Sequence, residues 1–108
     1  MNWSLSQIAA AVNGRLVGAD VTVEGVTTDT RAIAKGALFI ALAGERFDAH
    51  DFLDQAMAAG AGALLVADAG KLPAGVSAVV VDDTRLALGR LAAAWRREFT
   101  LPVIAVTG

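Results

Sequence analysis

The sequence predicts an α/β fold: a small, mainly parallel sheet with packed helices and an N-terminal hairpin. Three short apolar runs, at residues 37–42, 63–67 and 78–81, are typical of strands buried on both faces. Segments with helical spacing of apolar residues separate and follow these runs. Strands that alternate with helices favour a parallel sheet with right-handed crossovers, and 108 residues allow one ordinary domain.

The first predicted helix begins after Ser4. Ser4 and Gln7 are spaced as a capping box, in which each side chain satisfies a backbone N–H group of the other. The pair Asn13-Gly14 is expected to end the helix. Its apolar residues recur at helical spacing: Leu5, Ile8, Ala9 and Val12.

Residues 15–17 and 21–24 are expected to form the hairpin. The turn Gly18-Ala19-Asp20 separates these two short segments. Val21 and Val23 alternate with polar residues, as a strand with one buried and one wet face requires. We expect this hairpin to be an appendage of the parallel sheet.

A second helix is predicted over residues 52–59, with Asp51 as its cap and Gly60 at its end. His50 then lies beside a helix N-terminus, where backbone N–H groups favour an anion. A lone histidine beside a cap more often makes a structural hydrogen bond than a ligand contact, and we favour the structural interpretation.

The longest predicted helix covers residues 85–99. Asp82 and Asp83 precede it, and their pairing admits a metal site or acid–base chemistry. Capping explains both carboxylates and is the preferred interpretation. The expected apolar stripe of this helix comprises Leu88, Leu91, Ala92, Trp95 and Phe99.

Residues 103–106 form a fourth apolar run, which leads into Thr107-Gly108. A strand followed by glycine is how a phosphate-binding loop begins, so we expect these residues to open such a loop. The signal is weak by itself, because the lysine and hydroxyl residue of that motif are not in this sequence.

Most of the unusual polar residues lie on either side of the run at 37–42. Residues 27–31 read Thr-Thr-Asp-Thr-Arg, and residues 44–50 read Gly-Glu-Arg-Phe-Asp-Ala-His. Hydroxyl groups suit the oxygens of ribose, uracil or phosphate, a guanidinium suits phosphate, and a phenyl ring can cover a flat base. We expect two loops that converge on one ligand, although Thr-rich segments also end strands and an Arg can simply pair with Asp.

Composition excludes several classes of function. No cysteine and one histidine exclude disulfides, thiolate zinc sites, cysteine nucleophiles and multi-histidine metal centres. A net charge of −2, with no basic cluster larger than Arg96-Arg97, argues against nucleic-acid binding. The longest run of apolar residues and glycine, residues 56–67, is too short for membrane insertion, and the first residues lack signal-peptide character. We therefore expect a cytoplasmic protein.

Five segments, in this order, resemble the amino-terminal domain of the Mur ligase family, the ATP-dependent amide-forming enzymes of peptidoglycan precursor synthesis. The segments are TTDTR, LFIALAGERFDAHDF, QAMAAGAGALLV, VVDDTRLALGRLA and VIAVTG. The match extends from about Ser4 to Gly108. Within the family, GERFDAHDF after TTDTR is most similar to the members that add D-alanyl-D-alanine to UDP-N-acetylmuramoyl-tripeptide. The members that add diaminopimelate or lysine are the alternative.

The resemblance implies that this domain binds the UDP end of the muramoyl substrate. The residues implied to contact it are Thr28 and Thr30 in the first loop and Glu45, Arg46 and Phe47 in the second. The residues expected to shape these loops, rather than to touch the ligand, are Asp29, Arg31 and Gly44.

The resemblance also implies a domain boundary. Residues 1–101 would form the substrate-binding domain, and residues 102–108 the first strand of an ATP-binding domain, with Thr107 and Gly108 opening its phosphate loop. ATP and Mg²⁺ would serve the complete enzyme, in which central and C-terminal domains accompany this one. For this chain alone we expect no catalytic residue, no metal site and no bound cofactor.

Two interpretations from other classes compete with the ligase. A non-catalytic α/β interaction module would bind a protein, show no affinity for nucleotides and present an exposed apolar patch. A complete small hydrolase is disfavoured, because the sequence has no Ser or Cys nucleophile motif and its single histidine has no evident catalytic partner.

Overall fold

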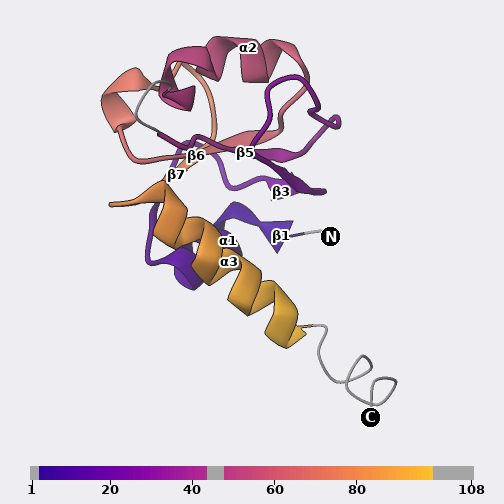
Figure 1. Ribbon diagram of the computed structural model, residues 1–108, viewed down its shortest axis with the longest axis vertical. Helices are drawn as coiled ribbons and strands as arrows, with labels where there is room; N and C mark the ends of the chain where they lie inside the picture. The colour runs from indigo at the N-terminus through magenta and orange to yellow at the C-terminus, as the bar shows by residue number, and fades with distance from the viewer. Residues whose placement is uncertain (1–2, 44–47, 99–108) are drawn as a thin grey trace.

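The computed structural model describes residues 3–43 and 48–98, which form an α/β structure in three layers (Figure 1). A five-stranded sheet is the middle layer. Helix α2 (Leu53–Ala58) lies on one face of it. Helices α1 (Leu5–Val12) and α3 (Thr84–Glu98) pack against each other on the opposite face. This architecture confirms the predicted fold class.

The strand order of the sheet is β2-β7-β6-β5-β4. Its members are β2 (Arg15–Val17), β4 (Val26–Thr27), β5 (Leu38–Ile40), β6 (Ala63–Val66) and β7 (Ala78–Val80). Strands β4, β5, β6 and β7 run parallel, while β2 runs antiparallel to β7. The three short apolar runs predicted to be buried strands thus contain the three central strands, β5, β6 and β7.

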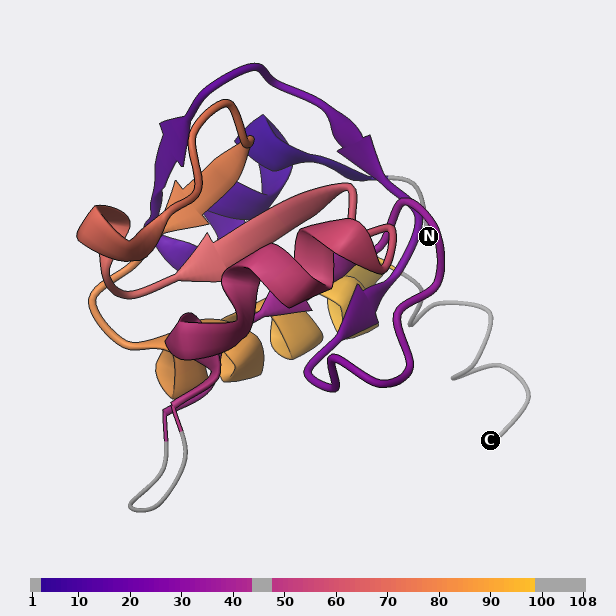
Figure 2. The ribbon, with the colours of Figure 1, turned by 90° about the horizontal axis from the view of Figure 1, so that it is seen from above.

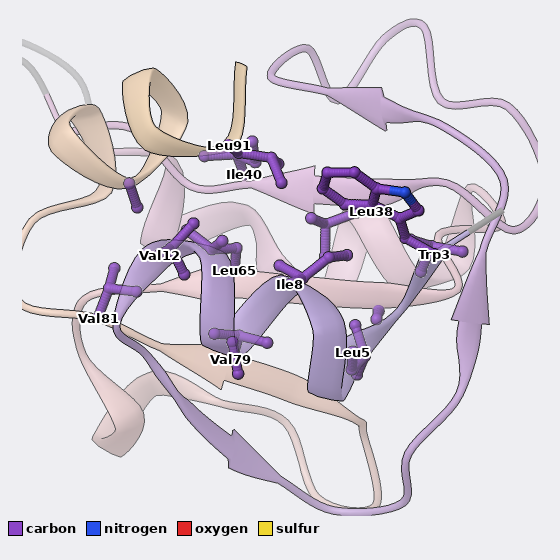
Figure 3. Close-up of a cluster of buried hydrophobic side chains, with 14 residues drawn as sticks. Trp3, Leu5, Ile8, Val12, Leu38, Ile40, Leu65, Val79, Val81 and Leu91 are labelled. Carbon is purple, nitrogen blue, oxygen red and sulfur yellow. The ribbon is translucent and has the colours of Figure 1, made fainter. Parts of the chain in front are cut away.

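Successive side chains of a strand point to opposite faces, and all three side chains of β5 are buried, so this strand is covered on both faces. Leu38 and Ile40 belong to the cluster that packs against α1 and α3 (Figure 3). Phe39, between them, belongs to the cluster beneath α2. Burial of each such side chain contributes about 1.5–3 kcal/mol, which accounts for the unbroken apolar character of the strand.

Helix α1 forms as predicted. Ser4 Oγ accepts a hydrogen bond from the Gln7 backbone N at 3.2 Å, and Gln7 Oε1 accepts one from the Ser4 backbone N at 3.0 Å. Asn13, with φ 56°, adopts the left-handed conformation that ends the helix. The predicted apolar face is the buried face.

The predicted N-terminal hairpin is wrong. Strand β2 pairs with β7, whereas β3 (Thr22–Val23) pairs with β1 (Trp3–Ser4) in a separate antiparallel sheet. Gly18, at φ 82°, passes so close to the segment just before β7 that a Cβ there would come within 2.7 Å of the Val76 carbonyl oxygen. Residues 15–17 pair with the buried strand β7, although the turn at residues 18–20 favoured a local hairpin.

The second helix begins differently from the prediction. A 3-10 turn, η1 (Ala49–Phe52), precedes α2, and the carboxylate that caps it belongs to Asp48 rather than Asp51. Asp48 Oδ1 accepts from the His50 backbone N at 2.9 Å. Since Asp48 is held opposite Ala43 in an antiparallel bridge, the chain turns earlier than the sequence pattern indicated.

The buried face of α3 is rotated relative to the prediction. Leu91 is buried as expected, but Ala92 and Trp95 are exposed, and Ala87 is buried in their place. The helix lies along α1, where Arg90 Nη1 donates to the Val12 carbonyl oxygen at 3.4 Å. Packing against α1 therefore determines which face of α3 is buried, and the apolar pattern of α3 alone does not show this contact.

Several predictions lie outside the described residues. These are the strand at 103–106, the boundary between residues 101 and 102, Phe99, Thr107 and Gly108, and the loop residues Gly44, Glu45, Arg46 and Phe47. Within the described part of the chain, no helix has the length and apolar character needed to span a membrane.

Candidate nucleotide-binding edge

The loops after β4 and β5 leave the same edge of the sheet, because these strands are parallel neighbours. Thr27 lies opposite Phe39, and the loop that contains Thr28 and Thr30 follows directly. Figure 2 shows the segment between β4 and β5 at the margin of the sheet, beside α2. The carboxyl ends of parallel strands are where open α/β sheets bind ligands.

A cavity of about 410 Å³ opens at this edge. Its lining comprises Thr28, Asp29, Thr30, Arg31 and Phe39. Four of these residues belong to the predicted first loop, residues 27–31, so the structure brings most of that loop together around one concave surface. The volume lies in the range of small-ligand sites.

The three threonines of this loop differ in their surroundings. Thr27 Oγ1 accepts from the Asp29 backbone N at 3.2 Å and lies 3.4 Å from the Ala32 carbonyl oxygen, to which it donates. Among the described residues, the hydroxyls of Thr28 and Thr30 have no such internal partner. Thr27 therefore shapes the loop, and Thr28 and Thr30 retain a donor and acceptor for a ligand.

Asp29 and Arg31 bind each other within the loop. Arg31 Nε and the Arg31 backbone N both donate to Asp29 Oδ1, at 3.1 and 2.8 Å, and Nη2 donates to Oδ2 at 3.3 Å. The side-chain bond, followed by the backbone bond, holds the pKa of Asp29 below its ordinary value, and the same carboxylate raises the pKa of Arg31. Both groups are therefore charged at neutral pH.

Phe39 is a member of the cavity lining that sequence reasoning did not single out. It was counted only as part of a buried strand. Side chains alternate along a strand, so the sequence could have placed Phe39 on the face opposite Leu38 and Ile40. Its side chain is fully buried, so it supports the base of the cavity and presents no exposed ring to a ligand.

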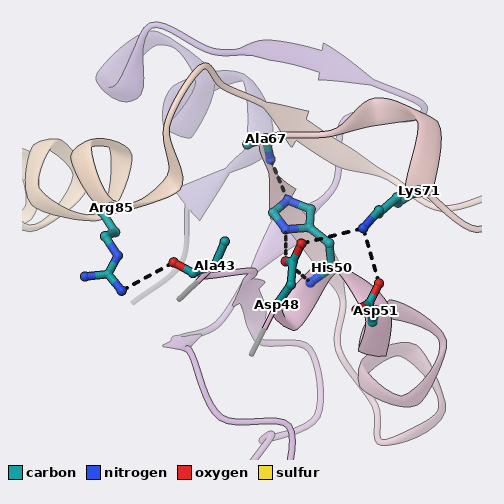
Figure 4. A network of polar contacts seen from close by, with 7 residues as sticks. All are labelled: Ala43, Asp48, His50, Asp51, Ala67, Lys71 and Arg85. Carbon is teal, nitrogen blue, oxygen red and sulfur yellow. Dashed lines mark hydrogen bonds and ion pairs between the residues drawn. The ribbon is translucent and has the colours of Figure 1, made fainter. Parts of the chain in front are cut away.

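The second predicted loop is bracketed by Ala43 and Asp48, which face each other in the antiparallel bridge. Its predicted contact residues Glu45, Arg46 and Phe47 lie outside the described part of the chain. Each of these two residues also contacts side chains from other parts of the chain. Arg85 Nη2 donates to the Ala43 carbonyl oxygen at 3.3 Å, and Asp48 binds His50 and Lys71 (Figure 4).

His50 makes structural hydrogen bonds, as favoured from the sequence. Its ring is 4% exposed, with Nδ1 2.7 Å from Asp48 Oδ1 and Nε2 accepting from the Ala67 backbone N at 2.9 Å. The backbone N–H of His50, followed by its ring, lowers the pKa of Asp48. Lys71 lies 3.5 Å from Asp48 Oδ2 and 3.2 Å from Asp51 Oδ1, and the bond to Asp51 is the main reason that its pKa is raised.

A second cavity, of about 230 Å³, lies between the ends of β5, β6 and β7 and the start of α3. Asp82 and Asp83 contribute to its lining. Asp83 caps α3 as predicted, with Oδ1 accepting from the backbone N of Arg85 at 2.8 Å and of Leu86 at 3.2 Å. No such capping bond involves Asp82 among the described residues, so capping accounts for one of the two carboxylates.

Within residues 3–43 and 48–98, no three His, Asp or Glu side chains gather in a way that would hold a metal ion. These residues therefore offer no such cluster for the Mg²⁺ that the resemblance implies for a complete enzyme. What the edge offers instead is hydrogen bonding and one ion pair, above a buried apolar base.

Comparison with known proteins shows the family of this chain. Residues 22–96 match the family described as "Mur ligase family, catalytic domain". The chain belongs to the Mur ligase family. The matched span includes the loop after β4 and all three central strands, so this Mur ligase chain carries the family pattern across its candidate site.

Individual relatives agree with this assignment. The chain is 54% identical over 105 residues to the UDP-N-acetylmuramoyl-tripeptide–D-alanyl-D-alanine ligase of Escherichia coli K12, covering 97% of this chain and 23% of that protein. It is 36% identical over 108 residues to the UDP-N-acetylmuramoyl-L-alanyl-D-glutamate–2,6-diaminopimelate ligase of Geobacter metallireducens, covering 96% and 21%.

Solved structures show the same fold. A crystal structure of MurF from Acinetobacter baumannii superposes with a TM-score of 0.80 at 36% identity, covering 91% of this chain and 22% of that one. MurF ligase from Thermotoga maritima in complex with ADP gives 0.63 at 27% identity, covering 71% and 18%. The Mur ligase chain described here thus spans less than a quarter of the length of these relatives.

Proposed function

We propose that this chain binds the UDP end of UDP-N-acetylmuramoyl-tripeptide, as the N-terminal domain of the ligase that adds D-alanyl-D-alanine to it. The single observation that supports this most is the cavity after β4, which gathers Thr28, Thr30 and Phe39 at the carboxyl edge of the sheet. Two hydroxyls without internal partners can bind the polar edges of uracil and ribose, and the buried Phe39 supports the base of the cavity beneath them.

Arg31 has a role in this proposal that follows from its pairing. Because its guanidinium is held by Asp29, it is not a free phosphate donor in this state. Asp29 and Arg31 instead fix the curvature of the loop that presents Thr28 and Thr30. Glu45, Arg46 and Phe47 complete the proposed site from the facing loop, and Gly44 shapes that loop.

An NMR titration tests the substrate assignment. UDP, and then UDP-N-acetylmuramic acid, should shift the amide resonances of residues 27–31 and 44–47 and leave those of α1 unchanged. Thr30→Val, which removes the hydroxyl while keeping the side-chain shape, should weaken the affinity. Thr22→Val, on an exposed residue of β3, is the matched control. A folded chain with no shift at Thr28 or Thr30 would count against the proposal.

The complete protein is proposed to be an ATP-dependent amide ligase of peptidoglycan synthesis, acting in cell-wall biogenesis, cell shape and division in the cytoplasm. ATP and Mg²⁺ would bind outside the part described here, beginning at Thr107 and Gly108, with residues 1–101 as the substrate-binding unit. In the complete enzyme, ATP would supply the phosphoryl group that activates the tripeptide carboxylate for attack by the dipeptide amine. This chain alone is proposed to be inactive in that reaction.

A second candidate is the ligase that adds diaminopimelate or lysine, because a diaminopimelate ligase is 36% identical over 96% of this chain. The 54% identity to a D-alanyl-D-alanine ligase favours the first candidate. Assaying the full-length protein with D-alanyl-D-alanine, diaminopimelate and lysine in parallel separates them. Amide formation with either single amino acid, and none with the dipeptide, would reverse the choice.

A further inference from the structure

We propose that the cavity at the start of α3 binds a small zwitterion, a molecule such as a free amino acid that carries an ammonium group close to a carboxylate. This cavity of about 230 Å³ lies where β5, β6 and β7 end. Among the described residues, it shares no lining residue with the cavity after β4. The inference is therefore independent of the proposed function.

Thr84 is the residue that points to a ligand. It is 4% exposed, and in the described part of the chain it is one of two buried polar side chains, the other being His50. Both ring nitrogens of His50 have hydrogen-bond partners, whereas the hydroxyl of Thr84 has none among residues 3–43 and 48–98. A buried polar side chain without a protein partner is rare in folded proteins.

The Thr84 hydroxyl reaches the cavity rather than being sealed in the core. Within the described residues, every fully enclosed polar side-chain atom has a hydrogen-bond partner. The hydroxyl of Thr84 lacks a partner, so it cannot be fully enclosed, and Thr84 is part of the cavity lining. One donor and one acceptor are thus available to a molecule that occupies the cavity.

Asp82 contributes a negative charge to the same lining. Its neighbour Asp83 is committed to the cap of α3, but the side chain of Asp82 has no hydrogen bond and no ion pair with any described residue. A carboxylate can only accept hydrogen bonds, and an ammonium group supplies three donors together with the opposite charge. Because no metal-binding cluster exists among the described residues, an ammonium group suits Asp82 better than a metal ion does.

Arg85 contributes a positive charge. Its Nη2 donates to the Ala43 carbonyl oxygen at 3.3 Å (Figure 4), which leaves its other N–H groups for a ligand. A guanidinium matches the two oxygens of a carboxylate. Arg85 and Asp82 line one cavity, yet within the described chain neither forms an ion pair with the other or with a third residue.

This separation of charges favours a zwitterion over simpler ligands. A simple cation would meet the like charge of Arg85, and a simple anion would meet those of Asp82 and Asp83. A neutral ligand would leave both charges without a counter-charge. The volume lies below the roughly 300–1,000 Å³ of sites for drug-sized ligands, so the ligand has few heavy atoms.

Two substitutions test the cavity, and each has a matched control. Thr84→Val removes the hydroxyl and keeps the side-chain shape, and Asp82→Asn removes the charge and keeps the size. Thr22→Val, on an exposed residue of β3, and Asp54→Asn, on an exposed residue of α2, make the same chemical changes away from the cavity.

The measurement is an NMR titration of the ¹⁵N-labelled chain with alanine. The amide resonances of Ala67, Asp82, Thr84 and Arg85 should shift, with a dissociation constant on the order of 1 mM for so small a ligand. Asp82→Asn should weaken binding about tenfold and Thr84→Val about fivefold, while both controls should bind like the unsubstituted chain. Unchanged affinity in both cavity variants would overturn the inference.

Two analogues of alanine separate its charges. Alaninamide keeps only the ammonium group and propionate only the carboxylate, so each should bind at least about tenfold more weakly than alanine. Equal binding of either analogue would make this a site for a single charge and overturn the inference. No shift with alanine at about ten times the expected dissociation constant would mean that the cavity holds only water, and would also overturn it. Neither result changes the outcome of the UDP titration, which reads residues of the other cavity.

Discussion

Arg31 contacts both carboxylate oxygens of Asp29 from two positions further along the same loop, at 3.1 Å from Nε and 3.3 Å from Nη2. The backbone N of Arg31 adds a third hydrogen bond to the same carboxylate. The one cation of the loop is therefore committed to shaping it. A ligand meets a preformed turn whose free polar groups are the hydroxyls of Thr28 and Thr30.

Replacing Asp29 with Asn should weaken UDP binding while leaving the melting temperature nearly unchanged. The amide can still accept from the Arg31 backbone N, but it loses the two-point ion pair that fixes the loop. The Arg31 side chain is 88% exposed and that of Asp29 43%, and ion pairs at the surface contribute little to stability. Titration calorimetry and a thermal melt of the same sample give the two readouts. A large fall in melting temperature would contradict this account.

Replacing Gly62 with Ala should destabilise the fold by about 1–3 kcal/mol. The segment before β6 passes so close to Gly36 that a Cβ at residue 62 would lie 2.8 Å from the Gly36 carbonyl oxygen. The backbone atoms of residue 36 cannot move aside as a flexible side chain would. Urea denaturation measures the change.

The matched control for that experiment is Gly25→Ala. An added Cβ at residue 25 meets nothing within 4 Å. We expect a change within about 0.5 kcal/mol, as for an ordinary surface substitution. Equal destabilisation by both variants would mean that loss of glycine, rather than close approach, determines the effect.

Replacing Leu65 with Ala should cost about 2–5 kcal/mol of unfolding free energy. Leu65 is fully buried in the central strand β6, in the cluster shared with α1 and α3. The comparison variant is Leu86→Ala, because Leu86 is 60% exposed on α3 and its truncation leaves no cavity. Chemical denaturation of both variants should separate them clearly, and a similar cost for both would show that β6 is not the centre of the core.

Stability should fall as the pH is lowered through 3.8 and below, in part because of Asp48. Its pKa in the folded chain lies below the ordinary value of 3.8, so its contribution is present above 3.8 and is lost as pH falls through the folded pKa. Asp48→Asn should therefore lower the melting temperature at pH 6 and flatten its decline toward pH 3. An unchanged acid profile in the variant would assign the decline to other carboxylates.

The sequence was sufficient where structure follows from local pattern. Strands β5, β6 and β7 were predictable because a strand buried on both faces must be apolar throughout, and α1 because Ser4 and Gln7 form its capping box. The loop at residues 27–31 stood out by its unusual density of hydroxyl and charged groups.

Where structure depends on distant partners, the prediction failed. The turn signal at Gly18 was real, but β2 pairs with β7, about sixty residues further along the chain. The buried face of α3 depends on its packing against α1, so Ala92 and Trp95 were assigned to the wrong side. Phe39 was recognised as core but not as part of the cavity lining, because only the folded structure brings the loop after β4 next to it.

The strand order also has a consequence for synthesis of the chain. Residues 15–17 leave the ribosome early, yet β2 completes its edge of the sheet only by pairing with residues 78–80. During translation, the first strand of the sheet must therefore wait while β4, β5 and β6 emerge, and it can join only after β7 does. An α1 helix formed early, by contrast, can provide a surface on which the later strands assemble.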